Sequence, residues 1–403
     1  MDFQLDKKHT MAQSLFKDFA EKEVKPLAID TDETEEFPRV TVDKMAKNGF
    51  LGIAIPEQYG GQGCDPLTYV MCVEELAKVC GTTSVIVSAH SSLCCDPILH
   101  YGSEEQKQKY LVPLAKGEKL GAFGLTEPGA GTDAQGVQTK AVLSEDGKEW
   151  ILNGSKCFIT NGKEADVYII IAYTDVVETK RGKQKKFTAF IVEKGTEGFT
   201  FGTKEHKMGI RGSQTCELHL ENVELDESRI LGGPEGITNA QGKHVGGVGF
   251  GFKTAMMTLD AGRAVVAAQA NGLALAVIEQ LIEYGQTHME GGKPLSANKA
   301  FAFKVAELKA NVECGRQLVF HTAFMRDAGL NHGMESCMSK LYCTDNAINT
   351  TREAMNLMGV NGLKKGSRME KLFRDARILS IYEGTNQVQR LVITNSLFPR
   401  KKK

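Results

Sequence analysis

Three zones of hydrophobic and polar patterning follow one another along the chain. Up to about residue 120, apolar positions recur with helical spacing, as in 67–79 and 104–114. Between about 121 and 232, short runs rich in Val, Ile, Phe, Tyr and Leu are separated by Gly, Asn, Asp and Lys turns, which is typical of strands. Long apolar-striped segments then return. The patterning predicts a multidomain α+β protein with helices, strands and helices in separate zones.

Individual elements follow from the same pattern. Thr10 is expected to cap a first helix with one apolar face, which carries Met11, Leu15, Phe16 and Phe19. The alternation of apolar and polar residues over 216–221 indicates a half-buried strand. Strands are expected at 141–143, 150–152, 167–173, 187–192 and 217–223, and helix breaks at 291–294, 329–333 and 359–366.

Composition and charge narrow the function classes. The chain has 403 residues, of which 41% are hydrophobic and 25% charged, and its net charge is −1. This balance does not favour nucleic acid or an anionic membrane as a partner. No apolar run is judged long enough to span a bilayer, and the start, Met1 to Gln4, lacks the features of a signal peptide. The sequence therefore predicts a cytoplasmic protein.

Cysteine and histidine usage gives no sign of a metal. The ten cysteines include no Cys-x-x-Cys pair, and the nine histidines are dispersed. In a cytoplasmic chain this distribution predicts free thiols, many of them in the core, and no zinc or iron–sulfur site.

One segment near the carboxyl terminus combines features of a catalytic site. Ile381 to Gln387 separates two helical runs, 369–380 and 388–398. Gly384 has no Cβ, so a ligand can approach the backbone there, and Thr385 and Asn386 are good residues to cap the next helix. The carboxylate of Glu383 could remove a proton from a ligand bound at this point. The alternative is a capped turn with a solvated glutamate.

Three more motifs precede this segment: 123–133, reading FGLTEPGAGTD; 153–161, reading NGSKCFITN; and 257–263, reading MTLDAGR. In order and spacing, the four motifs resemble those of the acyl-CoA dehydrogenases over nearly the whole chain. The resemblance implies an amino-terminal helical domain over 1–120, a middle β-barrel-like domain over 121–232 and a carboxy-terminal four-helix bundle over 233–403, reached through a Gly-rich linker. It also implies FAD as cofactor and a homotetramer.

The resemblance also assigns roles to residues. FAD would be contacted by Phe123, Leu125, Thr126, Gly131, Thr132, Phe158, Ile159, Thr160, Thr385, Asn386 and Gln387. Phe158 replaces a tryptophan common at this position and keeps an aromatic surface. Thr132, Asp260, Arg263 and Gly384 would contact the substrate. The alternatives are a plain turn for the first loop and an ion pair for Asp260 and Arg263, which are three positions apart.

Glu383 is the expected base. Some relatives carry the base on the bundle helix instead, where this chain has Gly262, which cannot serve. The backbone N–H of Glu383 would also donate a hydrogen bond to the thioester carbonyl, which stabilises the developing enolate.

At the positions where the family contacts the pyrophosphate and adenosine of FAD, this chain has different residues. His288 stands where many relatives have an arginine that reaches the FAD pyrophosphate of a neighbouring subunit, and Lys299 replaces a glutamine. Asn356 to Val360, with Gly359, replaces a Gln-Ile-x-Gly-Gly motif that meets adenosine. Histidine lacks the permanent two-pronged donor of arginine, so FAD is expected to be held more weakly or differently, with Lys299 as a substitute cation.

Two surface segments have no assigned role. The basic run 180–186 is expected to be a solvated hairpin tip, with contact to CoA phosphates as the alternative. The Gly-rich linker, 231–252, is longer than the family's loop by roughly a dozen residues. It is expected to be a tolerated surface insertion, with a lid over the acyl pocket as the alternative.

The expected reaction is the interconversion of an acyl-CoA and its 2,3-enoyl-CoA, with electrons exchanged through an electron-transferring flavoprotein. Side chains do not accept hydrides, and no Gly-x-Gly-x-x-Gly fingerprint opens a βαβ unit, so flavin is favoured over a nicotinamide. The sequence looks most like short-chain butyryl-CoA dehydrogenases of anaerobes, some of which run as enoyl-CoA reductases. The alternatives are an aryl-acryloyl-CoA reductase, such as one for caffeoyl-CoA, a flavin oxidase, and a non-catalytic acyl-CoA or partner-binding scaffold.

Overall fold

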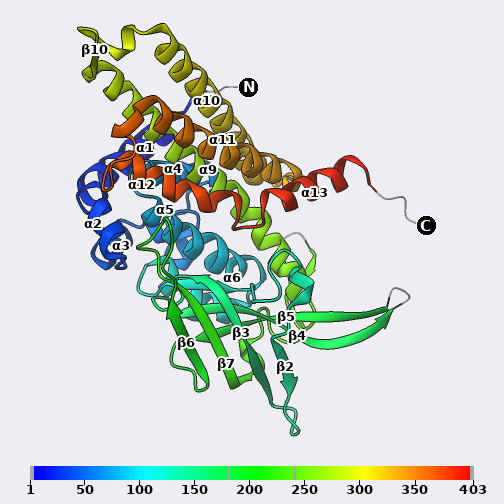
Figure 1. Ribbon diagram of the computed structural model, residues 1–403. Coiled ribbons are helices and arrows are strands. Elements are labelled where there is room, and N and C mark those ends of the chain that lie inside the picture. The colour runs from blue at the N-terminus through cyan, green and yellow to red at the C-terminus, as the bar shows by residue number, and fades with distance from the viewer. Residues whose placement is uncertain (1–3, 180–181, 240–241, 400–403) are drawn as a thin grey trace.

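The computed structural model describes residues 4–179, 182–239 and 242–399. Helices, a sheet and a second set of helices follow one another along the chain, and the sheet lies below the two helical parts (Figure 1). The expected α+β fold class is therefore confirmed. The prediction of no signal peptide was made from Met1 to Gln4, and residues 1–3 lie outside the described residues. The hairpin tip 180–181 also lies outside them.

The amino-terminal part consists of short helices. These are α1 (Lys7–Phe19), α2 (Ala28–Thr34), α3 (Arg39–Lys47), α4 (Pro66–Val79), α5 (Gly81–Ser88), α6 (Asp96–Tyr101), α7 (Glu104–Gln106) and α8 (Val112–Ala115). The prediction for α1 was wrong in two respects. Asp6 rather than Thr10 is the cap, because its carboxylate accepts from the His9 backbone N–H. Phe16 and Phe19 are buried, but Met11 and Leu15 are exposed.

The middle part is one sheet of seven strands. They are β1 (Gly121–Gly124), β2 (Lys140–Leu143), β3 (Glu149–Thr160), β4 (Val167–Thr179), β5 (Gly182–Glu193), β6 (Phe199–Lys204) and β7 (Thr215–Asp226). The order is β1-β4-β2-β3-β7-β6, and β5 pairs with β4 in a long hairpin that projects from the body (Figure 1). The alternation predicted for 216–221 is confirmed in β7. Sequence analysis did not find β1 and β6, which are short.

The carboxy-terminal part is built on α9 (Gly251–Thr287), which runs from the sheet to the far end of the bundle (Figure 1). Around it lie α10 (Lys299–Asp327), α11 (Gly333–Met358), α12 (Arg368–Ala376) and α13 (Asn386–Leu397). Two small hairpins interrupt the chain: β8 (Ile237–Thr238) with β9 (His244–Val245), and β10 (Met289–Glu290) with β11 (Lys293–Pro294). All the predicted helix breaks are present.

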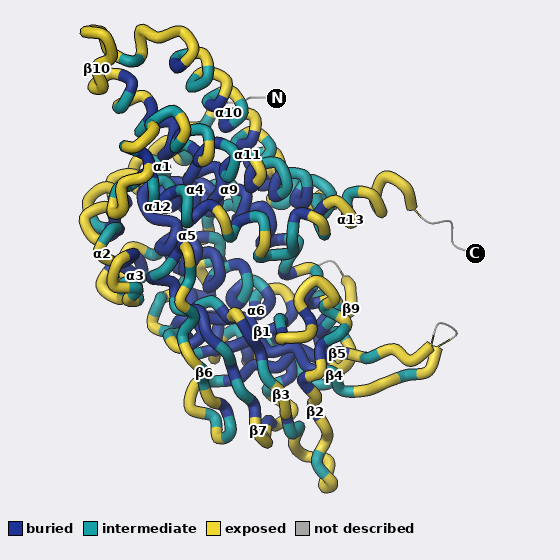
Figure 2. The backbone as a smooth tube through the Cα atoms, viewed as in Figure 1, coloured by how far each residue is buried: buried dark blue, intermediate teal, exposed yellow. Residues whose placement is uncertain are grey.

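The prediction that no apolar run is long enough for a membrane span was wrong for α9. This helix has the length and composition of a span, but 78% of its most apolar window is buried inside the protein. It is dark blue over most of its length in Figure 2. Its apolar character therefore serves the bundle core, where Gly and Ala allow close helix contact.

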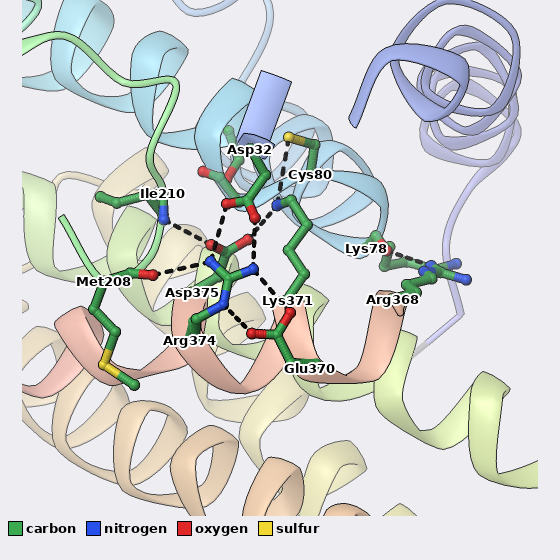
Figure 3. Close-up of polar contacts among 12 residues, drawn as sticks. Asp32, Lys78, Cys80, Met208, Ile210, Arg368, Glu370, Lys371, Arg374 and Asp375 are labelled. Atoms are coloured by element: carbon green, nitrogen blue, oxygen red, sulfur yellow. Dashed lines mark hydrogen bonds and ion pairs between the residues drawn. The ribbon is translucent and has the colours of Figure 1, made fainter. Parts of the chain in front are cut away.

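A buried ionic network joins the three parts of the chain (Figure 3). Arg374 on α12 binds the carboxylate of Asp32 on α2 and donates to the Met208 carbonyl oxygen at 2.9 Å. Asp375 accepts from the Ile210 backbone N–H at 2.6 Å and from Lys371 at 2.5 Å. Since α12 leads directly into the 381–385 turn, the network fixes the approach to that turn.

Candidate active site

The 381–385 segment forms the predicted turn between two helices. Glu383 and Gly384 both have positive φ, 54° and 84°, which reverses the chain tightly. The Thr385 hydroxyl accepts from the Val388 backbone N–H and caps α13, as predicted. Asn386 is the first residue of that helix, and its buried side chain bonds to α11 instead of capping. A non-glycine residue at positive φ is costly, so surrounding groups must hold Glu383 in place.

The side chain of Glu383 lies against α9 at Gly262. A Cβ at Gly262 would be 2.8 Å from Glu383 Oε2 and 3.1 Å from Cδ. The absence of a side chain at position 262 therefore makes room for the carboxylate. The two positions that sequence analysis compared as sites for a base are thus neighbours in space.

The Glu383 carboxylate is poised to take up a proton. Its Oε2 atom is buried and has no hydrogen-bond partner among the described residues. Burial raises the pKa of this group to about 7, although the positive charges of Arg263 and Lys340 act in the opposite direction. A carboxylate with a pKa near neutrality and a free oxygen has the properties of a general base.

Asp260 and Arg263 form the ion pair that their spacing suggests. Arg263 is only 4% exposed and also donates to Cys337 Sγ at 3.3 Å. Burial raises the pKa of Asp260, and Arg263 and His332 lower it. The pair therefore places a cation beside Glu383 and a carboxylate one helical turn away.

Other residues that hold the turn were not found by sequence reasoning. The Tyr382 hydroxyl bonds to Gln269 Oε1 on α9, and Gln269 Nε2 donates to the Gly81 carbonyl oxygen at 3.0 Å. Lys340 on α11 donates to the Gly384 carbonyl oxygen and to Asn386 Oδ1. Lys340 lies on a polar stretch of α11, and no sequence motif marks it.

The two motifs predicted to contact the flavin meet in the middle part. The Cys157 backbone N–H donates to the Thr126 carbonyl oxygen at 2.9 Å, which joins the loop after β1 to β3. A buried ion pair, Lys156 Nζ to Glu127 Oε1 at 2.7 Å, fastens the same junction. Burial lowers the pKa of Lys156 to about 8, although Glu127 acts in the opposite direction. Neither residue was singled out from the sequence.

This junction fits a planar aromatic group. Phe158 sits at an irregularity of β3 with φ of 58°, and 64% of its surface is exposed, so an apolar ring is presented outward. Gly129 and Gly131 in the facing loop have open space where a Cβ would stand. A flavin would cover the exposed ring and the bare loop, with Ile159 and Thr160 next along β3. Phe123, on β1, and Leu125, directly after it, are buried where the loop begins.

A cavity of about 910 Å3 adjoins α9 on the side of Asp260 and Ala261. Its lining includes Ser92, Tyr101, Lys243, Met257, Asp260 and Arg326. The volume lies within the range of sites for large cofactors and substrates. Lys243 belongs to the inserted linker, which therefore contributes to the wall of this cavity.

The residues predicted to hold the far end of FAD lie elsewhere. His288 ends α9 and stacks on Tyr284, with ring centroids 4.6 Å apart, and Asn361 donates to the Tyr284 hydroxyl at 3.1 Å. The 26 positions between Gly262 and His288 correspond to roughly 39 Å along the helix. His288, Lys299, Asn356 and Gly359 are all exposed. Within one chain, the structure does not bring them to the Glu383 turn.

Among the described residues, no cluster of His, Cys, Asp or Glu could hold a metal ion. All ten cysteines are free thiols and eight of them are buried, as predicted.

Comparison with known proteins identifies the family. Residues 6–118 match the acyl-CoA dehydrogenase N-terminal domain, 122–223 the middle domain and 249–398 the C-terminal domain. The chain belongs to the acyl-CoA dehydrogenase family. It is therefore an oxidoreductase that acts on CH–CH groups, and the resemblance seen in the four motifs is confirmed.

Two proteins of known function are similar to this chain in sequence. A short-chain-specific acyl-CoA dehydrogenase of Clostridium acetobutylicum is 44% identical over 398 residues, covering 99% of this chain and 100% of that protein. A 3-(aryl)acrylate reductase of Clostridium sporogenes is 40% identical over 389 residues, covering 96% and 98%.

Two solved structures share the fold. Butyryl-CoA dehydrogenase from Megasphaera elsdenii has a TM-score of 0.90 at 42% identity, covering 98% of this chain and 100% of that chain. A chain in a structure described as the electron transferring flavoprotein of Acidaminococcus fermentans has a TM-score of 0.91 at 42% identity, covering 99% and 100%.

Proposed function

We propose that this acyl-CoA dehydrogenase interconverts acyl-CoA and 2,3-enoyl-CoA thioesters, with FAD as cofactor and Glu383 as the base. The observation that carries the proposal is the buried, unpaired Glu383 Oε2 beside Gly262, with the pKa of the carboxyl raised to about 7. Among the described residues near this turn, Arg263 is a cation and Asp260 is paired with it. Asp345 is paired with Arg390 and also accepts from Asn386, so neither carboxylate offers a comparably free acceptor.

The residues of this chain supply proton transfer and charge stabilisation. Glu383 accepts the α-proton of the thioester in the oxidative direction and returns it in the reductive direction. The backbone N–H of Glu383 donates to the thioester carbonyl and stabilises the enolate, an effect on the order of 3 kcal/mol. Binding of the thioester excludes water from the turn, and Asp260, Arg263, Gly384 and Thr132 orient it. When bound, FAD supplies the acceptor or donor of the β-hydride.

The FAD site proposed here uses two surfaces. The flavin would be held by Phe158, Ile159 and Thr160 on β3, by the loop that contains Phe123, Leu125, Thr126, Gly131 and Thr132, and by Thr385, Asn386 and Gln387. The exposed ring of Phe158 and the open space at Gly131 support this assignment. The far end of the dinucleotide would be held by His288, Lys299, Asn356 and Gly359 of a neighbouring copy. Their exposure and their distance of roughly 39 Å from Gly262 along α9 support a site shared between chains.

A homotetramer is proposed on the same grounds. Large apolar side chains remain exposed in the carboxy-terminal part of the chain, namely Phe303, Phe324, Val360, Leu363, Leu391, Leu397 and Phe398. Such a set on one part of the chain is typical of surfaces covered by other subunits.

An electron-transferring flavoprotein is the proposed redox partner, and cytoplasm the proposed location. The likeness to the chain in the Acidaminococcus fermentans structure supports the partner.

Aryl-acryloyl-CoA reduction is the second candidate function, because a 40% identical relative is a 3-(aryl)acrylate reductase. A non-catalytic scaffold fits less well, since it has no use for a buried carboxylate oxygen without a hydrogen-bond partner, which destabilises the fold.

The experiment compares purified wild-type protein with Glu383→Gln, and with Glu221→Gln on β7 as an exposed control. Wild-type protein should show a flavin spectrum and turn over short-chain or aryl thioesters with an artificial acceptor or donor. Glu383→Gln should lose on the order of a hundredfold or more in turnover and keep its flavin spectrum. A wild-type protein without flavin or turnover supports the scaffold, and peroxide formation with substrate supports an oxidase.

A further inference from the structure

Lys340 is a buried cation beside the proposed base that the mechanism so far does not use. Its side chain is fully buried on α11. The ammonium group donates to the Gly384 carbonyl oxygen at 2.9 Å and to Asn386 Oδ1 at 2.8 Å. Both acceptors are neutral, although a buried charge ordinarily requires a charged partner. Two hydrogen bonds to neutral atoms therefore do not account for a positive charge at this buried position.

The first part of that role is geometric. Glu383 and Gly384 are consecutive residues at positive φ, and the strain at Glu383 must be held by its surroundings. The Gly384 carbonyl oxygen accepts from Lys340 and also from Gln389 Nε2 at 2.8 Å. Asn386 Oδ1, on the first residue of α13, accepts a hydrogen bond from the same ammonium group. Lys340 thus contacts the turn at two points directly after Glu383.

The second part is electrostatic. The charged and titratable groups that face Lys340 are Glu383 from the turn, Arg263 from α9, and Asp345 and Cys337 from its own helix. Burial lowers the pKa of Lys340 to about 8, while Glu383 and Asp345 raise it. Arg263 and Lys340 are the two cations that lower the pKa of Glu383 against the effect of burial. Arg263 is already paired with Asp260, whereas Lys340 has no carboxylate bonded to it among the described residues.

We propose that Lys340 is a positioning residue for the reaction: it fixes the Glu383–Gly384 turn through the Gly384 carbonyl, and its positive charge keeps the Glu383 carboxylate available as a base. The inference rests on the proposed role of Glu383. It identifies a cation that determines when that residue can accept a proton.

Two substitutions separate the hydrogen bond from the charge. Lys340→Gln retains a donor and loses the charge, and Lys340→Arg retains the charge. Ser339→Ala is the matched control, because Ser339 is buried on the same helix and bonds toward Thr322 and Leu318 on α10. All variants are purified as holoenzyme, and kcat/KM for the oxidative reaction is measured from pH 5 to 10.

Lys340→Gln should move the acid limb of the profile upward by about one pH unit, because an opposing charge has been removed. Lys340→Arg should leave the acid limb in place, because arginine retains the positive charge over this range. Ser339→Ala should retain the wild-type profile. An unshifted acid limb in Lys340→Gln, or an acid limb that shifts as far in Lys340→Arg as in Lys340→Gln, overturns the proposal.

A second readout does not depend on turnover. Infrared titration detects the protonated Glu383 carboxyl as a band that is absent in Glu383→Gln. The midpoint of this band should rise in Lys340→Gln and remain unchanged in Ser339→Ala, and an unchanged midpoint in Lys340→Gln overturns the proposal. If Glu383→Gln turns over normally, the proposed function itself fails. If Glu383→Gln is inactive and Lys340→Gln shifts nothing, only the role of Lys340 fails.

Discussion

Gly262 on α9 faces the carboxylate of Glu383 so closely that a Cβ at position 262 would lie 2.8 Å from Oε2. The glycine is therefore part of the site, although it contributes no functional group. Glu383 reaches this space from a turn more than 100 positions further along the chain, and the two residues together define where a substrate proton would be received.

The first prediction concerns this space. Gly262→Ala should fold normally, because the atoms it meets belong to the end of a flexible side chain, but it should displace the carboxylate. A displacement of about 1 Å in a catalytic group can cost on the order of a hundredfold in rate. The measurement is kcat with saturating thioester, together with flavin content. Combining Gly262→Ala with Glu383→Asp, whose shorter side chain leaves room for the Cβ, should restore part of the loss; no recovery would show that the methyl group acts on something other than the carboxylate.

The second prediction concerns stability and pH. The pKa of Glu383 is about 7 in the folded protein against 4.5 for an ordinary glutamate, so between these values the folded state binds more protons than the unfolded state. The stabilising contribution of the protonated group is complete below pH 4.5 and is lost as pH rises through 7. Glu383→Gln should therefore be more stable than wild type at pH 8, by on the order of 3 kcal/mol, and by much less near pH 5.

Urea unfolding at both pH values, monitored by circular dichroism, measures this difference. Glu221→Gln is the control and should show none, because Glu221 is exposed. The measured quantity is the difference in unfolding free energy between Glu383→Gln and wild type. If this difference is no larger at pH 8 than at pH 5, the carboxylate is solvated.

The third prediction concerns the Lys156–Glu127 ion pair, which fastens the Thr126 loop to β3. Lys156→Met leaves a buried carboxylate without its cation, which should cost about 3–5 kcal/mol and loosen the loop that faces Phe158. Flavin content per subunit and the midpoint of thermal unfolding should both fall. Adding Glu127→Gln neutralises the stranded carboxylate and should restore part of the thermal stability, and a double variant as unstable as Lys156→Met alone would contradict the role assigned to the charge.

The sequence predicted the order of the three parts and the turn at Glu383 because these depend on local patterns. Strand alternation, the glycine breaks and the Thr385 cap are properties of neighbouring residues. Lys340, Gln269 and Lys156 were missed because each acts through a contact with a distant segment, and a lysine that will be buried looks like any solvated lysine in the sequence. Thr10 was mistaken for a cap because Asp6, one turn earlier, competes for the same backbone groups.

The last prediction concerns the surface at the end of α9. His288 stacks on Tyr284 and is exposed, so it can reach a neighbouring copy, but its imidazole lacks the two-pronged donor of a guanidinium. His288→Arg would add a fixed positive charge and a two-pronged donor suited to a pyrophosphate. If the far end of FAD reaches this surface, the variant should bind FAD more tightly, by roughly tenfold or more, and the gain should weaken as salt is raised. Titration of apo-protein with FAD, followed by flavin fluorescence, measures the affinity.

A second substitution tests whether the site is shared. Lys299→Ala, on the exposed first turn of α10, should weaken FAD binding if this lysine substitutes for the missing arginine, and His288→Arg should compensate in the double variant. Mixing Glu383→Gln subunits with subunits altered at Lys299 offers a further check, because a shared site makes the FAD affinity of one subunit depend on the residues of the other. Equal affinities in wild type, His288→Arg and Lys299→Ala would show that the dinucleotide ends elsewhere, and that the exposed residues around Tyr284 do not belong to the cofactor site.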